Sequence, residues 1–532
     1  MAAIEVREIE LLDSTLHASG HLADDLWALL RCGGVPVGYA HLRPQRLRSG
    51  ALPFGEVVAR SLTPMHADHA LRVAFDTWVR RSGTPAGFSV KEGLDALREA
   101  GARPRFDDVP ASAPRISVAI CSRDRSQLLA RAVESIVSTL GSADELLVVL
   151  NAPSDVAGSF DRDRFPSVRV VVEHRPGLSW ARNRAIAEFQ GDVLLFTDDD
   201  CVPNEHWVAA HRSLFTRNPD VDVVTGTVEP LVMDSPAQQL FEAYGGFPRH
   251  YARRWMSRPD RGPVAQQVGD LGVGANLGIR RRVFDGIGHF DAALGPGTEC
   301  SAGDDTEYLF RALKSGLLIA CEPRASVRHE HRRDMDGLRS QIGGWSRGFS
   351  CAMWRSTVAF PDERRAFGAF RRSVAVAHHA WRALCSPRLR ELAMLELWEM
   401  RRPSSRYASA RAVAVELASE HASPAQDMPP APVNTTSVRD SAAPIEDLAL
   451  GLTDFGTPLV LAERVRHAYC KVVVGSKHVG QERLRVFHGV IGADRMLDAM
   501  SETLVGYVGY GKWNRAVAAS LEYLRASMRA GV

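Results

Sequence analysis

Residues 191–201 read GDVLLFTDDDC, and this stretch decides the fold of the chain. Four apolar residues run directly into the carboxylates Asp198, Asp199 and Asp200, and Pro203 soon prevents further sheet pairing. The pattern predicts a buried strand that carries acids at its carboxyl end. Clustered carboxylates in a core need a neutralising partner, and a hard divalent cation such as Mg²⁺ or Mn²⁺ suits them. The simpler alternative is a strand-end turn whose acids are solvated.

Strands and helices alternate along the chain around this stretch. Apolar segments at 116–122, 145–151 and 168–174 have the length of buried strands, and helical segments at 126–140 and 178–190 alternate with them. The alternation predicts a mainly parallel sheet covered by helices on both faces. In such sheets, ligands bind beyond the carboxyl ends of the strands. The sequence places polar residues there, namely Ser122, Arg123, Asp124, Arg125, Asn151 and Arg175 together with the three Asp.

Two later segments carry further candidate residues. GDDTEYLFRAL at 303–313 brings Asp304, Asp305 and Glu307 into the first turn of a predicted helix, where the helix dipole favours negative charge. Simple capping explains any one of these acids. Further on, His329 and His331 share one face of a short predicted strand. Two imidazoles so placed can bind a metal, but the neighbouring arginines suit phosphate pairing equally well.

Composition places the chain among globular proteins with several domains. It has 532 residues, of which 45% are hydrophobic and 24% are charged, and its formal net charge is +2. This balanced charge provides no overall field for nucleic acid, so we expect no nucleic-acid partner. No apolar run is long enough to span a bilayer, and no secretion signal is evident. We expect no transmembrane segment and a cytoplasmic location, with peripheral contact at the inner membrane face as an alternative.

Changes of pattern divide the chain into five parts. We expect an N-terminal α+β accessory domain at 1–112, a sheet domain at 113–350, a helical extension at 351–420, a flexible linker at 421–444 and a C-terminal helical domain at 445–532. The linker is rich in Pro, Ala and Ser and lacks aromatic residues. The last part has no recognisable catalytic motif. It could dock a partner, form a homo-oligomer or only stabilise the rest of the chain.

The order of these segments resembles the family-2 glycosyltransferases, whose catalytic domain has the GT-A nucleotide-sugar-binding fold. The resemblance covers roughly residues 114–350 and depends on six motifs: ISVAICSRDR, ELLVVLNAPSD, GLSWARNRAI, FTDDDC, GANLGIRRRVF with GHFD, and GDDTEYLFR. Each motif is weak alone, but six in order at plausible spacing are specific. The resemblance implies an α/β fold with a GT-A-type, mainly parallel sheet flanked by helices. It also implies transfer of a sugar from a nucleoside-diphosphate sugar to an acceptor hydroxyl.

The same resemblance implies roles for individual residues. It implies that Asp305 is the catalytic base, and that Mn²⁺ or Mg²⁺ is held by Asp198, Asp200 and His329. Donor or nucleotide contacts are expected from Ser122, Arg123, Asp124, Asn151, Arg182, Asn183, Asp198 and Asp199. Candidates on the acceptor side are Asn276, Asp304, Trp345 and Arg347.

The chemistry of sugar transfer requires such a set of residues. Negative charge grows on the departing diphosphate as its bond to the anomeric carbon breaks, and a divalent ion stabilises that charge. The pKa of an acceptor hydroxyl is far too high for its alkoxide to be populated at neutral pH, so a carboxylate must take the proton as the new bond forms. One base and one metal imply direct displacement with inversion and no glycosyl-enzyme intermediate.

One position departs from the family pattern. Many relatives have an Asp after the second strand that pairs with uracil, whereas this chain has Leu150 followed by Asn151. Leu cannot accept that hydrogen bond, so either Asn151 substitutes, or the base is recognised elsewhere, or the donor is not a uridine nucleotide. A UDP-sugar is the preferred donor, with a dTDP- or GDP-sugar as the alternative. The acceptor could be a carbohydrate, a glycolipid or a small molecule, because acceptor pockets are built from variable loops.

Two other classes of protein share parts of this pattern. A sugar-nucleotide nucleotidyltransferase has a related sheet and metal-bound acids, but it usually carries a glycine-rich loop after the first strand, and ISVAICSRDRSQLL has no glycine. A non-catalytic nucleotide- or carbohydrate-binding scaffold would keep the fold without turnover. The intact Asp198, Asp200 and Asp305 argue against such a loss of activity.

Overall fold

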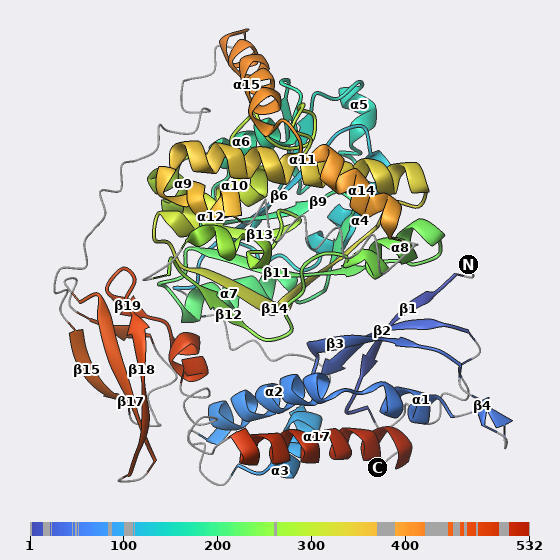
Figure 1. The fold of residues 1–532 in the computed structure, drawn as a ribbon, viewed down its shortest axis with the longest axis vertical. Helices are drawn as coiled ribbons and strands as arrows, with labels where there is room; N and C mark the ends of the chain where they lie inside the picture. The colour runs from blue at the N-terminus through green and yellow to red at the C-terminus, as the bar shows by residue number, and fades with distance from the viewer. Residues whose placement is uncertain are drawn as a thin grey trace.

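A nine-stranded mixed sheet forms the centre of the protein in the computed structural model (Figure 1). The hydrogen-bonded order is β10-β14-β11-β13-β9-β6-β7-β8, and β12 pairs with β14 outside this path. The structure describes residues 3–13, 22, 24–44, 46–47, 50–51, 53–82, 88–100, 110, 112–259, 263–369, 389–420, 445–450, 458–461, 465–474, 477–499 and 510–530.

Four parallel strands form one half of this sheet, as the sequence predicts. They are β6 (Ile116–Ser122), β7 (Glu145–Asn151), β8 (Arg169–Glu173) and β9 (Val193–Asp198). Along β6 the side chains alternate between two buried faces, with Val118 and Ile120 in one core and Ala119 and Cys121 in the other. Burial on both faces explains why β6 is a nearly continuous apolar run.

The other half of the sheet mixes strand directions, which the sequence pattern leaves open. β13 (Asn276–Arg280) runs antiparallel to both β9 and β11 (Val223–Pro230), and β14 (Ile319–His329) runs parallel to β11. The short strands β10 (Cys201–Pro203) and β12 (Arg254–Met256) pair antiparallel with β14. Because β10 follows the three acids directly, its pairing with β14 places those acids next to the end of β14.

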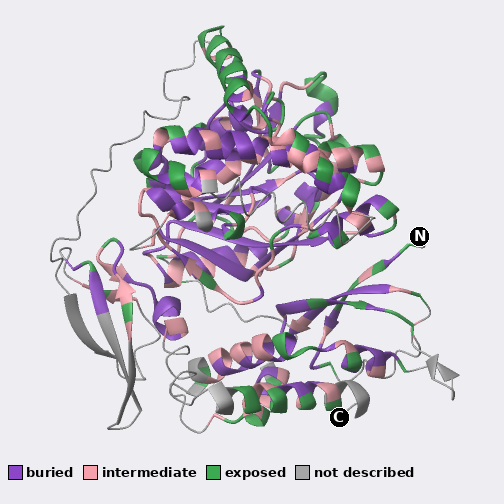
Figure 2. Ribbon diagram, viewed as in Figure 1, coloured by how far each residue is buried: buried purple, intermediate pink, exposed green. Residues whose placement is uncertain are grey.

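Helices cover both faces of the sheet and confirm the predicted α/β class. One face carries α4 (Ser126–Val137), α7 (Trp207–Arg217) and α8 (Pro236–Tyr244). The opposite face carries α6 (Leu178–Glu188), α9 (Arg281–Ile287) and α10 (Asp304–Lys314). The single turn α5 (Val156–Ser159) and the 3₁₀ turn η2 (Val264–Gln266) lie in connections. The buried residues concentrate along the sheet between these two layers (Figure 2).

A long helix, α11 (Met335–Ala359), runs through position 350, where the sequence pattern places a domain boundary. It is followed by η4 (Pro361–Glu363), α12 (Arg364–Ala369), α14 (Arg390–Glu399) and α15 (Pro403–Glu420). Both α14 and α15 pack on α11. The helical extension is therefore continuous with the sheet domain. Within the described ranges, every helix is either too short or too polar to cross a bilayer.

The N-terminal part contains a small sheet beside three helices. β1 (Glu5–Glu10) pairs parallel with β2 (Leu26–Cys32), which pairs antiparallel with β3 (Val35–Leu42), and β4 (Arg46–Leu47) pairs with β5 (Gly50–Ala51). Gly33 and Gly34 make the turn between β2 and β3 with φ angles of 58° and 75°. A two-residue turn with both φ angles positive favours glycine.

The C-terminal helix completes the core of this N-terminal part. The helices α1 (Phe54–Ser61), α2 (Pro64–Ser82) and α3 (Val90–Ala100) all contact α17 (Tyr510–Ala530), as Figure 1 shows for the blue and red helices. Leu521 and Leu524 of α17 belong to the same buried cluster as residues of α1 to α3. The two ends of the chain, assigned to separate domains from the sequence, thus share one core.

The helical prediction for the C-terminal part is wrong over most of residues 445–491. The strands there are β15 (Ile445–Leu450), β16 (Leu459–Val460), β17 (His467–Val474), β18 (Lys477–Arg485) and β19 (Val490–Ile491). The VVV run in β17 favours a strand, and Gly492 directly follows β19. Residues 493–499 and α17 are helical as predicted. The predicted linker at 421–444 lies outside the described residues.

Replacing Leu524 with alanine should destabilise the N-terminal core, because the side chain is fully buried within it. Such a change in a core costs about 2–5 kcal/mol. Hydrogen exchange of the α2 amides measures this loss locally. Val413→Ala on α15 is the control, because Val413 is 53% exposed and its loss should change little. Unchanged protection of α2 in Leu524→Ala would show that α17 is not part of this core.

Candidate active site

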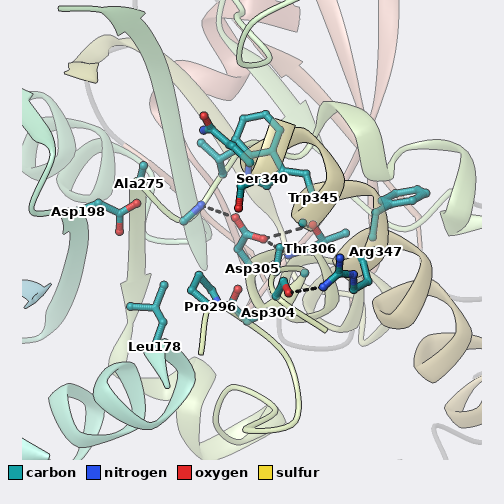
Figure 3. A pocket seen from close by; sticks show the side chains of 18 of the residues that line it. Leu178, Asp198, Ala275, Pro296, Asp304, Asp305, Thr306, Ser340, Trp345 and Arg347 are labelled. Carbon is teal, nitrogen blue, oxygen red and sulfur yellow. Dashed lines mark hydrogen bonds between the residues drawn. The ribbon is translucent and has the colours of Figure 1, made fainter. Parts of the chain in front are cut away.

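A cleft of about 1580 Å³ opens at the carboxyl ends of β6, β7 and β9. Its walls come from the end of β9, the segment 268–275 with η3 (Val268–Asp270), the segment 296–306 that leads into α10, and the helices α11 and α14 (Figure 3). Pockets for one small ligand are usually about 300–1,000 Å³. The cleft therefore has room for more than one ligand.

The acids at the end of β9 are already paired with a cation. Asp199 accepts a hydrogen bond from Ser122 Oγ at 2.7 Å and another from Arg125 Nη1 at 3.0 Å. The same nitrogen of Arg125 donates to Asp200 Oδ2 at 3.2 Å. Asp199 and Asp200 are each only 5% exposed. Burial, with the nearby charge of Asp200, raises the pKa of Asp199, which shows how strongly this corner requires positive charge.

A buried guanidinium joins the end of β9 to the start of α10. Arg182 of α6 donates from Nη1 to Asp304 Oδ2 at 2.6 Å, and its Nη2 lies 3.5 Å from Asp198 Oδ1. Burial raises the pKa of Asp198 to about 7 against the lowering effect of Arg182, and the charges of Asp200 and Asp199 add to the rise. Burial alone would lower the pKa of Arg182, but Asp304 and Asp198 raise it instead. Arg182 is thus a permanent cation inside the protein.

Asp305 is the half-buried acid that lines the middle of the cleft. Its Oδ2 accepts a hydrogen bond from the Gly274 N–H at 2.8 Å, and its Oδ1 accepts one from the Thr306 N–H at 2.6 Å. In Figure 3 it lies between Asp198 on one side and Trp345 and Arg347 on the other. Because Asp304 is committed to Arg182, Asp305 is the acid of this pair that is available to a ligand.

Two histidines at the end of β14 lie next to the strand-end acids. Nε2 of His329 is 3.4 Å from Asp200 Oδ1, and Nδ1 of His329 is 2.9 Å from Nδ1 of His331. On its other side, His331 Nε2 is 2.8 Å from Glu242 Oε1. Burial, followed by the effect of His331, holds the pKa of His329 well below its ordinary value, so this ring is neutral.

The predicted metal ligands meet at the cleft, although they do not form a finished metal cage. Among the described residues, no group of three or more His, Cys, Asp or Glu side chains is arranged to hold a metal ion by itself. Asp198, Asp200 and His329 nevertheless all line the cleft. A cation at this place would need further ligands, from water or from a bound substrate.

Most of the site residues predicted from the sequence line this one cleft. They are Ser122, Arg123, Asn151, Arg182, Asp198, Asp199, Asp200, Asp304, Asp305, His329, Trp345 and Arg347. They are far apart in the sequence, and they meet because parallel strands end at the same edge of the sheet.

Two residues predicted to contact the donor do not line the cleft. Asp124 is exposed, and its carboxylate accepts a hydrogen bond from the Ser154 N–H at 2.9 Å. Asn183 is 1% exposed, and its amide donates to the Phe290 carbonyl at 3.0 Å and accepts from the Phe290 N–H at 2.9 Å. Both side chains bind local backbone groups outside the lining of the cleft, so the donor-binding role of these two residues stays a prediction that this geometry does not support.

The acceptor-side role of Asn276 likewise stays a prediction that the geometry does not support. Asn276 is fully buried in β13, where its amide donates to the carbonyls of Thr227 and Ala325 at 2.9 and 2.8 Å. Its Oδ1 accepts from Trp207 Nε1 at 2.9 Å. This side chain joins strands and helix inside the core.

Asn151 lines the cleft, but its amide is already used. Its Nδ2 donates to the Arg175 carbonyl at 2.8 Å, and its Oδ1 accepts from the Gly177 N–H at 2.9 Å. Asn151 therefore shapes the segment that precedes α6.

Two arginines in the cleft were noted in the sequence as polar neighbours of the site but were not assigned a ligand role. Arg125 pairs with Asp199 and Asp200, and Arg332 Nη2 lies 3.6 Å from Asp200 Oδ2. Local signals exist, because Arg125 ends the SRDR turn after β6 and Arg332 follows the two histidines. The tertiary structure adds that both guanidiniums lie beside Asp200.

The sheet, the strand-end acids and the acid at the start of α10 all lie within the part of the chain that a known family matches. The family described as "Glycosyltransferase like family 2" matches residues 114–348, and this match, with relatives named as glycosyltransferases, supports a glycosyltransferase enzyme. The match confirms the resemblance seen in the sequence.

Individual relatives are similar to parts of the chain. A glucosyl-dolichyl phosphate glucuronosyltransferase of Haloferax volcanii is 26% identical over 251 residues, which are 44% of this chain and 76% of the relative. Polypeptide N-acetylgalactosaminyltransferase 5 of Caenorhabditis elegans is 25% identical over 243 residues, which are 41% of this chain and 37% of the relative. A solved mannosyltransferase from Pyrobaculum calidifontis, in complex with GDP-Man and Mn²⁺, has a TM-score of 0.36 and 16% identity over 68% of this chain and 98% of that chain.

Gly274→Ala should destabilise the sheet domain, because the new Cβ would lie 2.4 Å from Nη2 of Arg182, which Asp304 and Asp198 hold in place. Overpacking of this kind costs about 1–3 kcal/mol. The melting temperature of the variant should fall by several degrees. Gly269→Ala is the matched control, because it lies in the same segment and its new Cβ would meet nothing within 4 Å. Equal melting temperatures for the two variants would contradict the packing of Gly274 on Arg182.

Proposed function

We propose that this chain moves a sugar from a nucleoside-diphosphate sugar to an acceptor hydroxyl by direct displacement with inversion, assisted by Mn²⁺ or Mg²⁺. One observation carries the proposal: a single cleft holds two separate acidic centres. The first is the group Asp198, Asp199 and Asp200 with its arginines, and the second is Asp305 in the first turn of α10. The first centre suits a metal diphosphate, and the second suits a hydroxyl that must lose a proton.

The arginines beside the strand-end acids supply the charge that a diphosphate needs. Arg123 is exposed at the end of β6, and Arg125 and Arg332 flank Asp200. Both of these last two guanidiniums approach Asp200 through one nitrogen, so their other N–H groups can donate to phosphate oxygens. A guanidinium is well matched to phosphate because it offers several donors in one plane.

The chain's own residues fit a hard divalent cation between Asp200 and His329. Glu242 accepts a hydrogen bond from Nε2 of His331, so the hydrogen between the two Nδ1 atoms, 2.9 Å apart, comes from His329 when His331 is neutral. Nε2 of His329 then presents a lone pair toward the Asp200 carboxylate at 3.4 Å. Two acceptors that face each other without a hydrogen between them favour a shared cation. A bound ion would stabilise negative charge on the leaving diphosphate.

Asp305 would act as the general base toward the acceptor. The backbone N–H groups of Gly274 and Thr306 hold its two oxygens, so the carboxylate is oriented before a substrate arrives. As the acceptor oxygen forms its bond to the anomeric carbon, its proton passes to Asp305 and the bond to the diphosphate breaks. The sugar is thereby transferred in one step, with inverted configuration.

The two residues at the end of β7, Leu150 and Asn151, are poorly placed to recognise the nucleotide base. Leu150 is 1% exposed, and the Asn151 amide is bound to the backbone. This favours a base contact elsewhere in the cleft or a donor other than a uridine nucleotide. A UDP-sugar remains the first donor to test, and dTDP- and GDP-sugars remain the alternatives. The predicted cytoplasmic location is unaffected by these contacts and stays a prediction.

Asp305→Asn should lower kcat by roughly 10²–10⁴-fold, because the amide cannot accept the proton of the acceptor hydroxyl. Nucleotide affinity should stay close to that of the unmodified protein, since the change is isosteric. Steady-state transfer rates and calorimetric nucleotide binding measure the two effects. Asp336→Asn, at the first turn of α11, is the control, because the Asp336 side chain is 94% exposed. Transfer at a near-normal rate in Asp305→Asn would show that another group is the base.

Asp200→Ala should weaken nucleotide binding in the presence of Mn²⁺ and leave metal-free binding much less affected, because the change removes one side of the cation site. Thermal stabilisation by UDP, dTDP, GDP and ADP, each with and without Mn²⁺, measures the effect. A metal-dependent shift for one nucleotide would also identify the donor base. Identical shifts with and without Mn²⁺ would contradict the metal assignment, and no shift with any nucleotide would favour a binding scaffold.

A further inference from the structure

The outer part of the cleft has an apolar wall that the transfer chemistry leaves unexplained. Three side chains of α14 line the cleft: Met394, Leu395 and Trp398. Met394 is 56% exposed and Trp398 is 60% exposed. They stand four residues apart, so they lie on the same face of the helix. Large apolar side chains at this exposure, inside a ligand cleft, are available to bind a partner molecule.

The charged side chains that line the cleft beside this wall are already paired. Arg339 Nε is 2.6 Å from Glu391 Oε1, and Arg347 Nε is 2.9 Å from Glu399 Oε2. Arg406 also contacts Glu399, at 3.0 Å. The wall therefore offers a ligand apolar surface and no uncompensated charge from these groups. The Arg401 guanidinium lies over the Trp398 indole, with its Cζ 4.5 Å from the ring centroid, so part of the ring is already covered. The paired charges inside the cleft favour a neutral ligand at the remaining apolar surface.

The apolar wall is held at a fixed position relative to Asp305. Arg347 joins the two, because its Nη1 donates to Ser301 Oγ at 3.1 Å while its Nε holds Glu399 of α14. Ser301 lies in the segment that leads into α10. Gly343 of α11 faces α14, where a Cβ would make an ordinary contact with Glu399 Cγ at 3.4 Å. A molecule seated on α14 is thus in the same cleft as the acid proposed to deprotonate the acceptor.

We propose that Met394 and Trp398 bind an aromatic ring of a neutral small-molecule acceptor, whose hydroxyl reaches Asp305. The inference rests on the proposed function and names its acceptor class. An indole face stacks on aromatic rings, and a methionine thioether also makes favourable contacts with them. The transfer step is unchanged: the acceptor oxygen bonds to the anomeric carbon, its proton passes to Asp305, and the nucleoside diphosphate leaves.

Calorimetric binding of two glycosides tests the proposal without any sugar transfer. The probes are 4-nitrophenyl β-D-glucopyranoside and methyl β-D-glucopyranoside, which differ in the aromatic ring. The full chain, without donor, should bind the aryl glycoside about tenfold more tightly, because of ring stacking on α14. Trp398→Ala should abolish this preference. Its exposure means that the core is not disturbed, and Val415→Ala on α15, where Val415 is 49% exposed, is the control that should keep the preference.

Several outcomes would overturn the proposal. These are equal affinity for the two glycosides, no detectable binding of the aryl glycoside, or a preference that survives in Trp398→Ala. Co-sedimentation with vesicles of equal parts phosphatidylcholine and phosphatidylglycerol is the second arm. Vesicle binding that is lost in Trp398→Ala would identify the wall as a membrane contact instead. Failure of sugar transfer with every nucleotide sugar would refute the proposed function, while the preference for the aryl glycoside would still be measurable.

Discussion

The buried Arg182 guanidinium is the interaction on which the rest of the site depends. It lies between Asp304 at the start of α10 and Asp198 at the end of β9, and a side chain at Gly274 would collide with it. Removal of one partner from a buried ion pair leaves an uncompensated charge and costs about 3–5 kcal/mol. One cation thus holds together the strand end, the helix start and the segment before β13.

This arrangement gives neighbouring acids different tasks. Asp304 forms an ion pair with Arg182. Asp305 instead faces the open cleft, where two backbone N–H groups orient its carboxylate. At the other centre, Arg125 balances Asp199 and Asp200, and the chain from Glu242 through His331 orients His329 toward Asp200. The acids are therefore divided into two groups: Asp198, Asp199 and Asp200 on the proposed donor side, and Asp305 on the proposed acceptor side. The α14 wall extends the acceptor side beyond Asp305.

The remaining parts of the chain support the sheet domain at positions outside the cleft. Asp494 pairs with Arg217 of α7 at 2.9 Å, and Asp498 pairs with Arg253 at 3.3 Å, so the segment after β19 is attached to the sheet domain. Because α17 completes the N-terminal core, the two ends of the chain are coupled. None of the described residues after Glu420 or before β6 lines the cleft. An attached unit of this kind is more easily explained by support or docking than by catalysis.

The sequence by itself determined the parallel strands, the acids at the end of β9 and the acid pair at the start of α10, because hydrophobic period and the position of polar residues after each strand are local properties. It did not determine the antiparallel β13, the strands after residue 445 or the shared core of the two chain ends, because these depend on distant partners. Asp124, Asn183 and Asn276 were assigned to ligands, yet each satisfies a nearby group of the protein. Polar side chains bind whatever donor or acceptor the fold brings near, and only tertiary structure decides whether that is backbone, a neighbouring side chain or open cleft.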